Sequence, residues 1–328
     1  CIRDMMRVRN NWAHCSAVLP GKDTIIADLD TLHQFFEQME ADTKVDAELQ
    51  RLMAEMGTST SDADLDAQLA AGIDAIVVCG TTGESATLSS SEQLTLIAHA
   101  MQYTAGRCKI IAGTGSNDTA HAIDLSRAAS SMGACAVLVV TPYYNKCTQS
   151  GLIAHYTAIA DAVSCPVICY NVPSRTGLDL KLETCQALAK HPNIQGVKEA
   201  GGSPAKIAKT IETCADDFFV WSGNDDEAVT AMALGAKGLI SVLSNVRPKK
   251  TLAMLRACQK NDFRTAGRLQ RELIPLIGAL FCEVNPIPVK KALELEGFPV
   301  GLPRLPLTEL SEEKLPMVKA ALAATPDA

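Results

Sequence analysis

Short apolar runs alternate with longer amphipathic segments along most of the chain, from about residue 72 onward. The apolar runs cover residues 74–79, 108–112, 135–141, 166–170, 194–198, 218–221 and 238–242. Within each run the apolar residues are continuous, as in parallel strands that are covered on both faces. The segments between them have helical spacing, as at residues 91–103, 119–131, 151–163, 181–190 and 204–214. This order predicts the repeated strand–helix units of an α/β protein.

The number of predicted strands is close to that of a closed parallel barrel. Seven strands are visible, whereas a (β/α)8 TIM barrel contains eight parallel strands. We therefore predict such a barrel, with a first strand that is not legible in the sequence and should come from residues 1–60. The stretches 16–19 and 24–27 are short candidates for it, residues 28–56 look helical and acidic, and 58–64 read as a polar linker.

The pattern changes after residue 245, where only helical spacing continues. Further helices are predicted over residues 248–259, 262–283, 286–296 and 307–324. They predict a helical appendage beside the barrel. The expected organisation is a divergent N-terminal segment (1–60), a barrel catalytic domain (61–261) and a C-terminal helical region (262–328).

Composition and charge exclude two classes of partner. The 328 residues are 47% apolar and carry a formal net charge of −7, which is typical of a globular protein with a sizeable core. Nucleic acid is not an expected partner, because phosphate neutralisation needs clustered Lys and Arg. A membrane is not expected either, since no apolar run approaches the ~20 residues of a spanning helix.

Cysteines and histidines are numerous enough to raise the question of disulfides and metals. The twelve cysteines include no C-x-x-C pair, and several fall in apolar runs, where free Cys behaves as a small hydrophobe. A reducing, cytoplasmic location therefore fits best. The six histidines show no ligand spacing, so no metal site is predicted. His99, His121 and His155 are expected on helix surfaces.

Polar and glycine-rich sequences follow the carboxyl ends of the predicted strands, the face that carries the active site in a (β/α)8 barrel. They are GTTGES at 80–85, GTG at 113–115, TPYYN at 141–145, YNVPSR at 170–175, KE at 198–199, SGN at 222–224 and IS at 240–241. Each alone is a plausible turn. Their shared placement on one rim is the stronger evidence for a site.

Lys198 lies near the end of the apolar run 194–198. Burial disfavours a charged lysine, and a neutral amine is a nucleophile toward carbonyl compounds. The alternative is a lysine that snorkels out or pairs with a carboxylate. Because side chains alternate along a strand, Glu199 points to the opposite face and is a poor partner, whereas Gly196 shares the interior and leaves room. This parity favours a functional lysine.

Other rim residues have both a functional and a structural interpretation. The phenol of Tyr170 could transfer protons, or it could be a buried tyrosine with one hydrogen bond. Thr81 and Thr82 suit a carboxylate in their glycine-flanked turn, or they cap a helix. Arg175 could grip a second carboxylate, although loop arginines are often only solvated.

The motifs resemble those of the dihydrodipicolinate synthase (4-hydroxy-tetrahydrodipicolinate synthase) family, within the N-acetylneuraminate lyase superfamily of class I aldolases. The resemblance covers roughly four fifths of the chain, from about Leu65 onward. It rests on GTTGESATL at 80–88, AGTGSN at 112–117, TPYYN at 141–145, YNVPSRTG at 170–177, GVKEA at 196–200, SGND at 222–225, GLISV at 238–242 and NPIPVK at 285–290.

The resemblance implies roles for residues of one active site. Lys198 forms a Schiff base with pyruvate, and no other cofactor is needed. Tyr170, Thr81 and Tyr144 form a proton relay, with Tyr144 reaching across a tight dimer from the neighbouring subunit. The remaining implied roles are a pyruvate carboxylate held by Thr82, an aspartate semialdehyde carboxylate held by Arg175, and backbone lining by Gly223 and Ile240.

The family also implies a pathway and an assembly. Condensation and cyclisation feed lysine (diaminopimelate) biosynthesis, and the enzyme is a homotetramer built as a dimer of dimers. N-acetylneuraminate lyase and keto-deoxy sugar acid aldolases or dehydratases are the alternative within the superfamily. The double threonine with the Ser174-Arg175-Thr176 sequence favours the synthase, since an arginine suits a small acidic aldehyde.

Two features depart from the family pattern. Members usually begin with a strand that ends in a Thr-Pro pair, and none is found before residue 65. The effector cleft of lysine-regulated members is matched by Ser85, Ala86, Asn117 and Tyr143. However, Ser90, Gln93 and His121 occur where the feedback-sensitive pattern has histidines and a glutamate, so we expect weak or absent inhibition by lysine.

Overall fold

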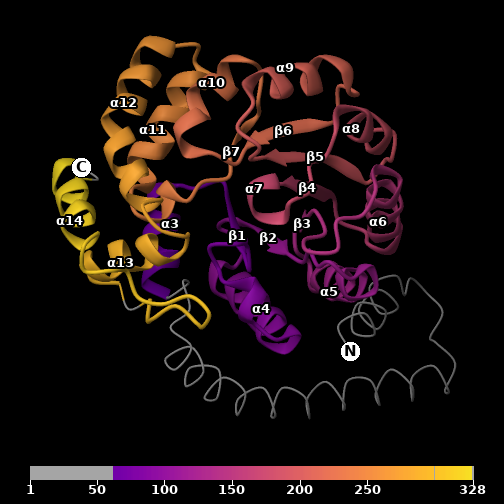
Figure 1. The fold of residues 1–328 in the computed structure, drawn as a ribbon, viewed down its shortest axis with the longest axis horizontal. Coiled ribbons are helices and arrows are strands. Elements are labelled where there is room, and N and C mark those ends of the chain that lie inside the picture. The colour runs from indigo at the N-terminus through magenta and orange to yellow at the C-terminus, as the bar shows by residue number, and fades with distance from the viewer. Residues whose placement is uncertain (1–61, 299, 327–328) are drawn as a thin grey trace, which may run out of the picture. The chain divides into compact units, whose positions relative to one another are not determined.

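The computed structural model describes residues 62–298 and 300–326. Seven strands form one parallel sheet in the order β1 to β7, with the curl of a (β/α)8 barrel (Figure 1). Their bounds are β1 (Ala75–Val78), β2 (Lys109–Gly113), β3 (Ala136–Val140), β4 (Val167–Asn171), β5 (Ile194–Glu199), β6 (Phe219–Ser222) and β7 (Gly238–Leu239). The predicted fold class is thus confirmed. The strand expected within residues 1–60 lies outside the described residues.

Helices surround the sheet on its outer side (Figure 1). They are α4 (Ser90–Thr104), α5 (Thr119–Met132), α6 (Gln149–Ala162), α8 (Leu182–Leu188), α9 (Pro204–Thr213), α10 (Ala228–Ala233) and α11 (Pro248–Gln259). Local sequence fixes where several begin, since a polar side chain at the N-cap satisfies a free backbone N–H. Ser89 and Glu92 form a capping box at α4, and Asp118 caps α5.

The two faces of the strands have different neighbours, as the alternation predicts. Ala136, Leu138, Ile168 and Tyr170 form one cluster in the barrel interior. The residues between them face the helices, where the fully buried Tyr156 of α6 donates to the carbonyl of Val139 at 3.0 Å.

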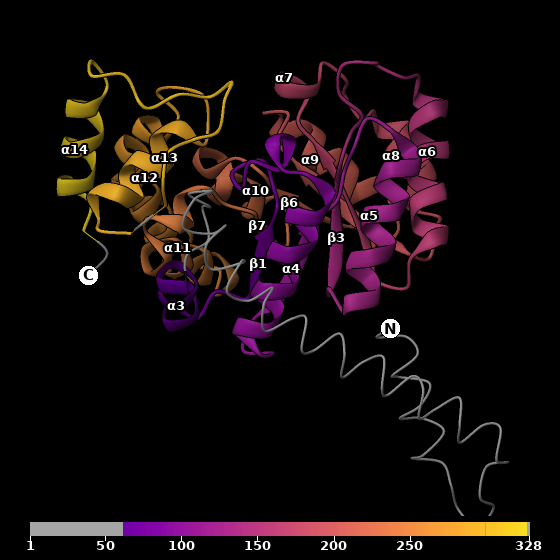
Figure 2. The same ribbon diagram turned by 90° about the horizontal axis from the view of Figure 1, so that it is seen from below.

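The C-terminal helices pack together on one side of the sheet (Figure 2). They are α12 (Phe263–Leu280), α13 (Ile287–Leu295) and α14 (Leu315–Ala324). The last helix was expected from residue 307 and begins eight residues later. Ser311 explains the delay, because its backbone N–H and its hydroxyl both donate to the carboxylate of Glu283 and hold this stretch out of the helix.

Two other expectations are corrected. The polar linker over residues 58–64 is wrong for its last residues, because helix α3 (Asp62–Ala71) begins at Asp62. Leu65 of this helix is fully buried, and Gln68 donates to the carbonyl of Ser244 at 2.9 Å. The last strand was expected over 238–242, but β7 ends at Leu239. The residues that follow bend around a buried carboxylate.

His155 does not lie on the surface of its helix, contrary to expectation. It is 5% exposed, and its Nδ1 lies 2.9 Å from the hydroxyl of Thr119, where α5 begins. The helical spacing of α6 was predicted correctly, but α5 covers the face of α6 that carries His155. Burial lowers the pKa of His155 from 6.5 to about 4.

This depressed pKa predicts a loss of stability in acid. Between pH 6.5 and 4 the unfolded chain binds a proton that the folded protein does not, so stability present above 6.5 is lost as the pH falls through 4. The unfolding free energy should fall between pH 7 and 4.5 by roughly 2 kcal/mol more in the wild type than in His155→Gln. Urea titrations at both pH values measure this difference. Equal losses in the two proteins would contradict it.

Candidate active site

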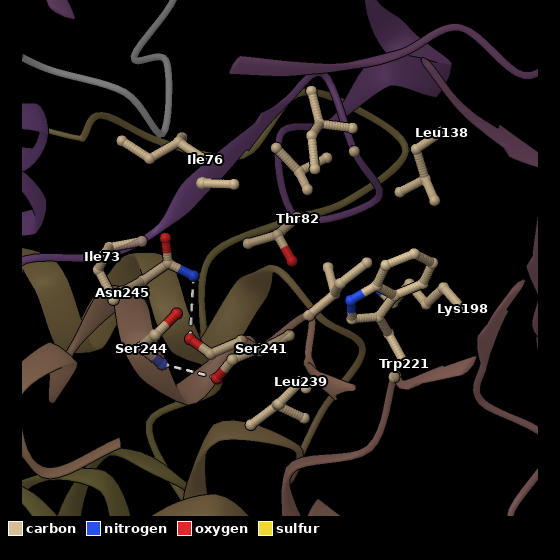
Figure 3. Close-up of a pocket in the computed structure, with 18 of the residues that line it drawn as sticks. Ile73, Ile76, Thr82, Leu138, Lys198, Trp221, Leu239, Ser241, Ser244 and Asn245 are labelled. Carbon is tan, nitrogen blue, oxygen red and sulfur yellow. Dashed lines mark hydrogen bonds between the residues drawn. The ribbon is translucent and has the colours of Figure 1, made fainter. Parts of the chain in front are cut away.

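One cavity of about 720 Å³ opens among the loops at the carboxyl ends of the strands and extends into the barrel interior. Every predicted catalytic and substrate-binding residue except Tyr144 lines it, namely Thr81, Thr82, Tyr170, Arg175, Lys198, Gly223 and Ile240. Figure 3 shows Thr82 near the centre of the cavity, with Trp221 and Lys198 beside one another to the right of it. Residues from three loops, two strands and the short helix that holds Arg175 thus meet at one place.

Lys198 and Tyr170 lie directly across two paired strands. They are register partners in β4 and β5, and the lysine Nζ lies 4.3 Å from the centroid of the Tyr170 ring. Gly223 makes room for the lysine stem, since a Cβ there would lie 3.0 Å from Lys198 Cε and 2.7 Å from Ala200 Cβ. An amine and a phenol are therefore held together at the edge of the cavity.

Glu199 does not neutralise Lys198, as the strand parity predicted. Its buried carboxylate accepts two bonds from the Asn171 amide, at 2.9 and 3.0 Å, and pairs with Lys206 at 3.1 Å. Lys206 also pairs with Asp179 at 2.6 Å. This network ties the ends of β4 and β5 together on the outer side and leaves the lysine amine to the cavity.

Trp221 was missed by the sequence interpretation, although it is one of only two tryptophans. It is the register partner of Lys198 on β6 and also lines the cavity. Gly196 accommodates the neighbouring strand, because a Cβ there would lie 2.0 Å from the Phe219 carbonyl oxygen and 2.8 Å from the Trp221 ring. The ring thus forms an apolar wall beside the amine.

The GTTGE turn after β1 is held in an unusual backbone conformation. Cys79 and Glu84 have φ of 57° and 55°, a region that side chains other than glycine rarely adopt. The buried carboxylate of Glu84 binds Lys290 Nζ at 2.7 Å and the Arg304 backbone N–H at 2.8 Å. Strained conformations persist where surrounding contacts over-determine them, so the C-terminal region fixes the turn that carries Thr81 and Thr82.

A buried carboxylate shapes the loop after β7. Asp225 accepts bonds from the backbone N–H groups of Val242 and Leu243, at 3.0 and 3.1 Å, and from the Ser241 hydroxyl. Burial raises the pKa of Asp225, while these bonds act in the opposite direction. The bend around Asp225 ends β7 and places Ile240 beside the cavity.

Arg175 lies in α7 (Pro173–Thr176), a single turn that the sequence interpretation read as a loop. Its guanidinium donates to the backbone carbonyl of Asn285 at 3.4 Å. The amide of Asn285 in turn donates to the hydroxyl of Thr82 at 3.0 Å. Asn285 belongs to the quoted NPIPVK motif but was not singled out, since nothing local relates it to residues 110 and 203 positions away.

The remaining predicted residues lie outside the cavity. Tyr144 is 89% exposed with a φ of 72°. Ser85 and Ala86 belong to the 3-10 turn η1 (Ser85–Thr87), while Asn117 and the exposed Tyr143 are brought close by the bond from Asn145 Nδ2 to the Asn117 carbonyl at 2.9 Å.

Neither a metal cluster nor a membrane-spanning helix occurs in the described part of the chain. Over residues 62–298 and 300–326, no three His, Cys, Asp or Glu side chains gather in a way that could hold a metal ion. None of the described helices has both the length and the apolar character that a bilayer-spanning helix requires.

The chain is similar to proteins of one family. Residues 55–325 match the model of the dihydrodipicolinate synthetase family. A 4-hydroxy-tetrahydrodipicolinate synthase of Exiguobacterium sibiricum is 52% identical over 262 residues, which are 78% of this chain and 89% of that protein.

Solved structures agree with this similarity. The chloride-inhibited dihydrodipicolinate synthase of Acinetobacter baumannii, in complex with pyruvate, is 43% identical, with a TM-score of 0.78 over 80% of this chain and 90% of the other. The enzyme of Cyanidioschyzon merolae with lysine bound is 38% identical, with the same TM-score over 80% and 90% of the chains.

Proposed function

Since the chain belongs to the dihydrodipicolinate synthetase family, we propose that it condenses pyruvate with aspartate semialdehyde to give 4-hydroxy-tetrahydrodipicolinate. It is a lyase of the class I aldolase type and serves lysine (diaminopimelate) biosynthesis. The observation that carries the proposal is the amine of Lys198 beside the ring of Tyr170, in a cavity that also holds Thr82 and Arg175.

The first half of the reaction activates pyruvate. Lys198 Nζ attacks the C2 carbonyl carbon, the new C–N bond replaces the C–O bond, and the carbonyl oxygen leaves as water. Tyr170 carries protons to that oxygen and away from the nitrogen. Thr82 binds the pyruvate carboxylate, and no metal or organic cofactor takes part. Loss of a methyl proton from C3 then gives the enamine.

The second half forms the carbon–carbon bond. Arg175 binds the carboxylate of aspartate semialdehyde with paired N–H donors. The enamine C3 attacks the aldehyde carbon, and the aldehyde oxygen takes up a proton. The amino group of the condensed chain then attacks the imine carbon, which closes the ring and releases Lys198. Gly223 and Ile240 line the site through their backbones.

Tyr144 completes the proton relay with Thr81 and Tyr170 from a neighbouring subunit. Its 89% exposure and left-handed backbone support this, because a strained, projecting aromatic residue on a rim is suited to a partner's site. We therefore propose a homotetramer built as a dimer of dimers, which sedimentation analysis with a Tyr144→Ala control tests. A cytoplasmic location fits this metabolic role.

An effector cleft lies at Ser85, Ala86, Asn117 and Tyr143, with weak or no response to lysine. Two contacts support the weak response: Ser90 Oγ lies 3.1 Å from His121 Nε2, and Gln93 Nε2 donates to the Ser85 carbonyl at 3.0 Å. A lysine titration of the condensation rate tests it.

We also propose the domain division at residues 60/61 and 261/262, with the first barrel strand supplied from residues 1–60.

A direct assay distinguishes this function from its siblings. Purified protein with pyruvate and aspartate semialdehyde should consume both and form the cyclic product, whereas sialic acid and keto-deoxy sugar acids should not be cleaved. Arg175→Ala should lower kcat/KM for the aldehyde by about 100-fold, as expected for a lost charge-assisted contact. Cleavage of a sugar acid without condensation would instead assign an N-acetylneuraminate lyase or related aldolase.

A further inference from the structure

Asn285 joins the C-terminal region to both carboxylate-binding side chains of the site. It lies between α12 and α13 and is 4% exposed. Its Nδ2 donates to Thr82 Oγ1 at 3.0 Å, and its backbone carbonyl accepts from Arg175 at 3.4 Å. All three residues line the same cavity.

The direction of the Asn285–Thr82 bond has a chemical consequence. A threonine hydroxyl has one hydrogen to donate and two lone pairs that accept, whereas an amide nitrogen only donates. Thr82 is therefore the acceptor in this contact, and its own hydrogen stays available. A carboxylate only accepts hydrogen bonds, so it can take that hydrogen. Bonds in such a chain polarise and strengthen one another.

We propose that Asn285 is a positioning residue that keeps the Thr82 hydroxyl oriented as a donor toward the pyruvate carboxylate. This inference rests on the proposed function, since it assigns Thr82 to pyruvate. It adds a donor chain that runs from Asn285 Nδ2 through Thr82 Oγ1 to the substrate.

The surroundings of Asn285 keep this chain in place. Five residues further on, Lys290 of α13 is 2% exposed and binds Glu84 of the same turn at 2.7 Å. The C-terminal region thus contacts the Thr82 turn through Asn285, Lys290 and the backbone of Arg304. Because Asn285 and Lys290 are both buried, the amide is held at a defined position relative to the hydroxyl.

Two substitutions separate this role from simple packing. Asn285→Ala removes the donor and should weaken pyruvate binding about tenfold, as for one hydrogen bond. Asn285→Asp has nearly the same shape, but its carboxylate accepts the Thr82 hydrogen and adds a negative charge beside an anionic substrate. It should weaken binding about 100-fold or more. The pyruvate dependence of borohydride trapping on Lys198 measures both effects without any aldehyde.

Three further comparisons keep the test specific. Asn285→Ala should add little in a Thr82→Val background, since both changes break the same chain. Binding to Asn285→Asp should recover as the pH falls and the new carboxyl gains a proton. Asn193→Asp is the matched control, because its amide binds the Ala160 and Val163 carbonyls at the opposite end of β5. It should leave pyruvate binding unchanged.

The outcomes are distinguishable from a failure of the proposed function. If wild-type protein forms no pyruvate adduct on Lys198, the proposed function fails and this inference with it. If the wild type forms the adduct but Asn285→Asp binds pyruvate as well as Asn285→Ala does, only the donor-chain inference is overturned. Fully additive effects of Asn285→Ala and Thr82→Val would overturn it too.

Discussion

Replacement of Lys198 by alanine should abolish covalent trapping of pyruvate and lower the condensation rate by roughly 10⁵-fold or more, as for the loss of a covalent nucleophile. After borohydride reduction with pyruvate, peptide mass analysis should find the adduct on Lys198 in the wild type. The same peptide of the variant should be unmodified.

The physical reason lies in the surroundings of the amine. Lys198 Nζ lies over the Tyr170 ring, and its stem passes Gly223, while Glu199 on the opposite face is paired elsewhere. Because Lys198 is half-buried and lines the cavity, its truncation enlarges an existing open space rather than leaving a void in the core, so the variant should stay folded.

Two other lysines provide a matched control, since Lys109 and Lys237 line the same cavity. They lie at or before the amino ends of β2 and β7, away from the rim. Lys237 contacts the Phe219 ring at 5.4 Å. Lys237→Ala should therefore keep the adduct and the activity. An adduct on Lys109 or Lys237 in the wild type, or full activity without Lys198, would contradict the covalent mechanism.

The positions of the strands could be predicted because strands that are buried on both faces consist of continuous runs of apolar residues. All seven described strands lie within one residue of the predicted starts. Two features differ from the prediction, the end of β7 and the burial of His155, and both result from contacts between residues that are distant in the sequence. The end of β7 depends on Asp225 binding Val242 and Leu243, and the burial of His155 depends on the helix beside it. Neither contact is visible in the hydrophobic periodicity of the sequence.

The positions of those site residues that lie at the ends of strands could be predicted from the sequence. Lys198 and Tyr170 end apolar runs and Gly223 comes shortly after one, and the barrel topology brings such ends together. Asn285 was not predictable in this way, since it comes from the helical appendage. Its relation to Thr82 exists only because α13 packs against the turn after β1, which no local pattern encodes.

Tyr170→Phe is expected to have the second-largest effect. Removal of the phenolic oxygen should lower kcat by about 10²- to 10⁴-fold, the range for a lost general acid–base group. The ring stays beneath Lys198, so the amine keeps its neighbour, and the variant should still form the pyruvate adduct, though more slowly. Rapid-quench borohydride trapping measures this rate, and a condensation assay measures kcat.

Tyr156→Phe is the matched control for this change. Tyr156 is also buried, but it lies on the helical side of the sheet, and its hydroxyl donates to the Val139 carbonyl at 3.0 Å. Its loss should lower the unfolding free energy by about 1 kcal/mol and leave kcat unchanged, because that hydroxyl does not face the cavity. Tyr170→Phe should show the reverse, with a large loss of rate and little loss of stability. If both variants lost stability alone, Tyr170 would be a packing residue, and the protons of the Schiff base would have to move through another group.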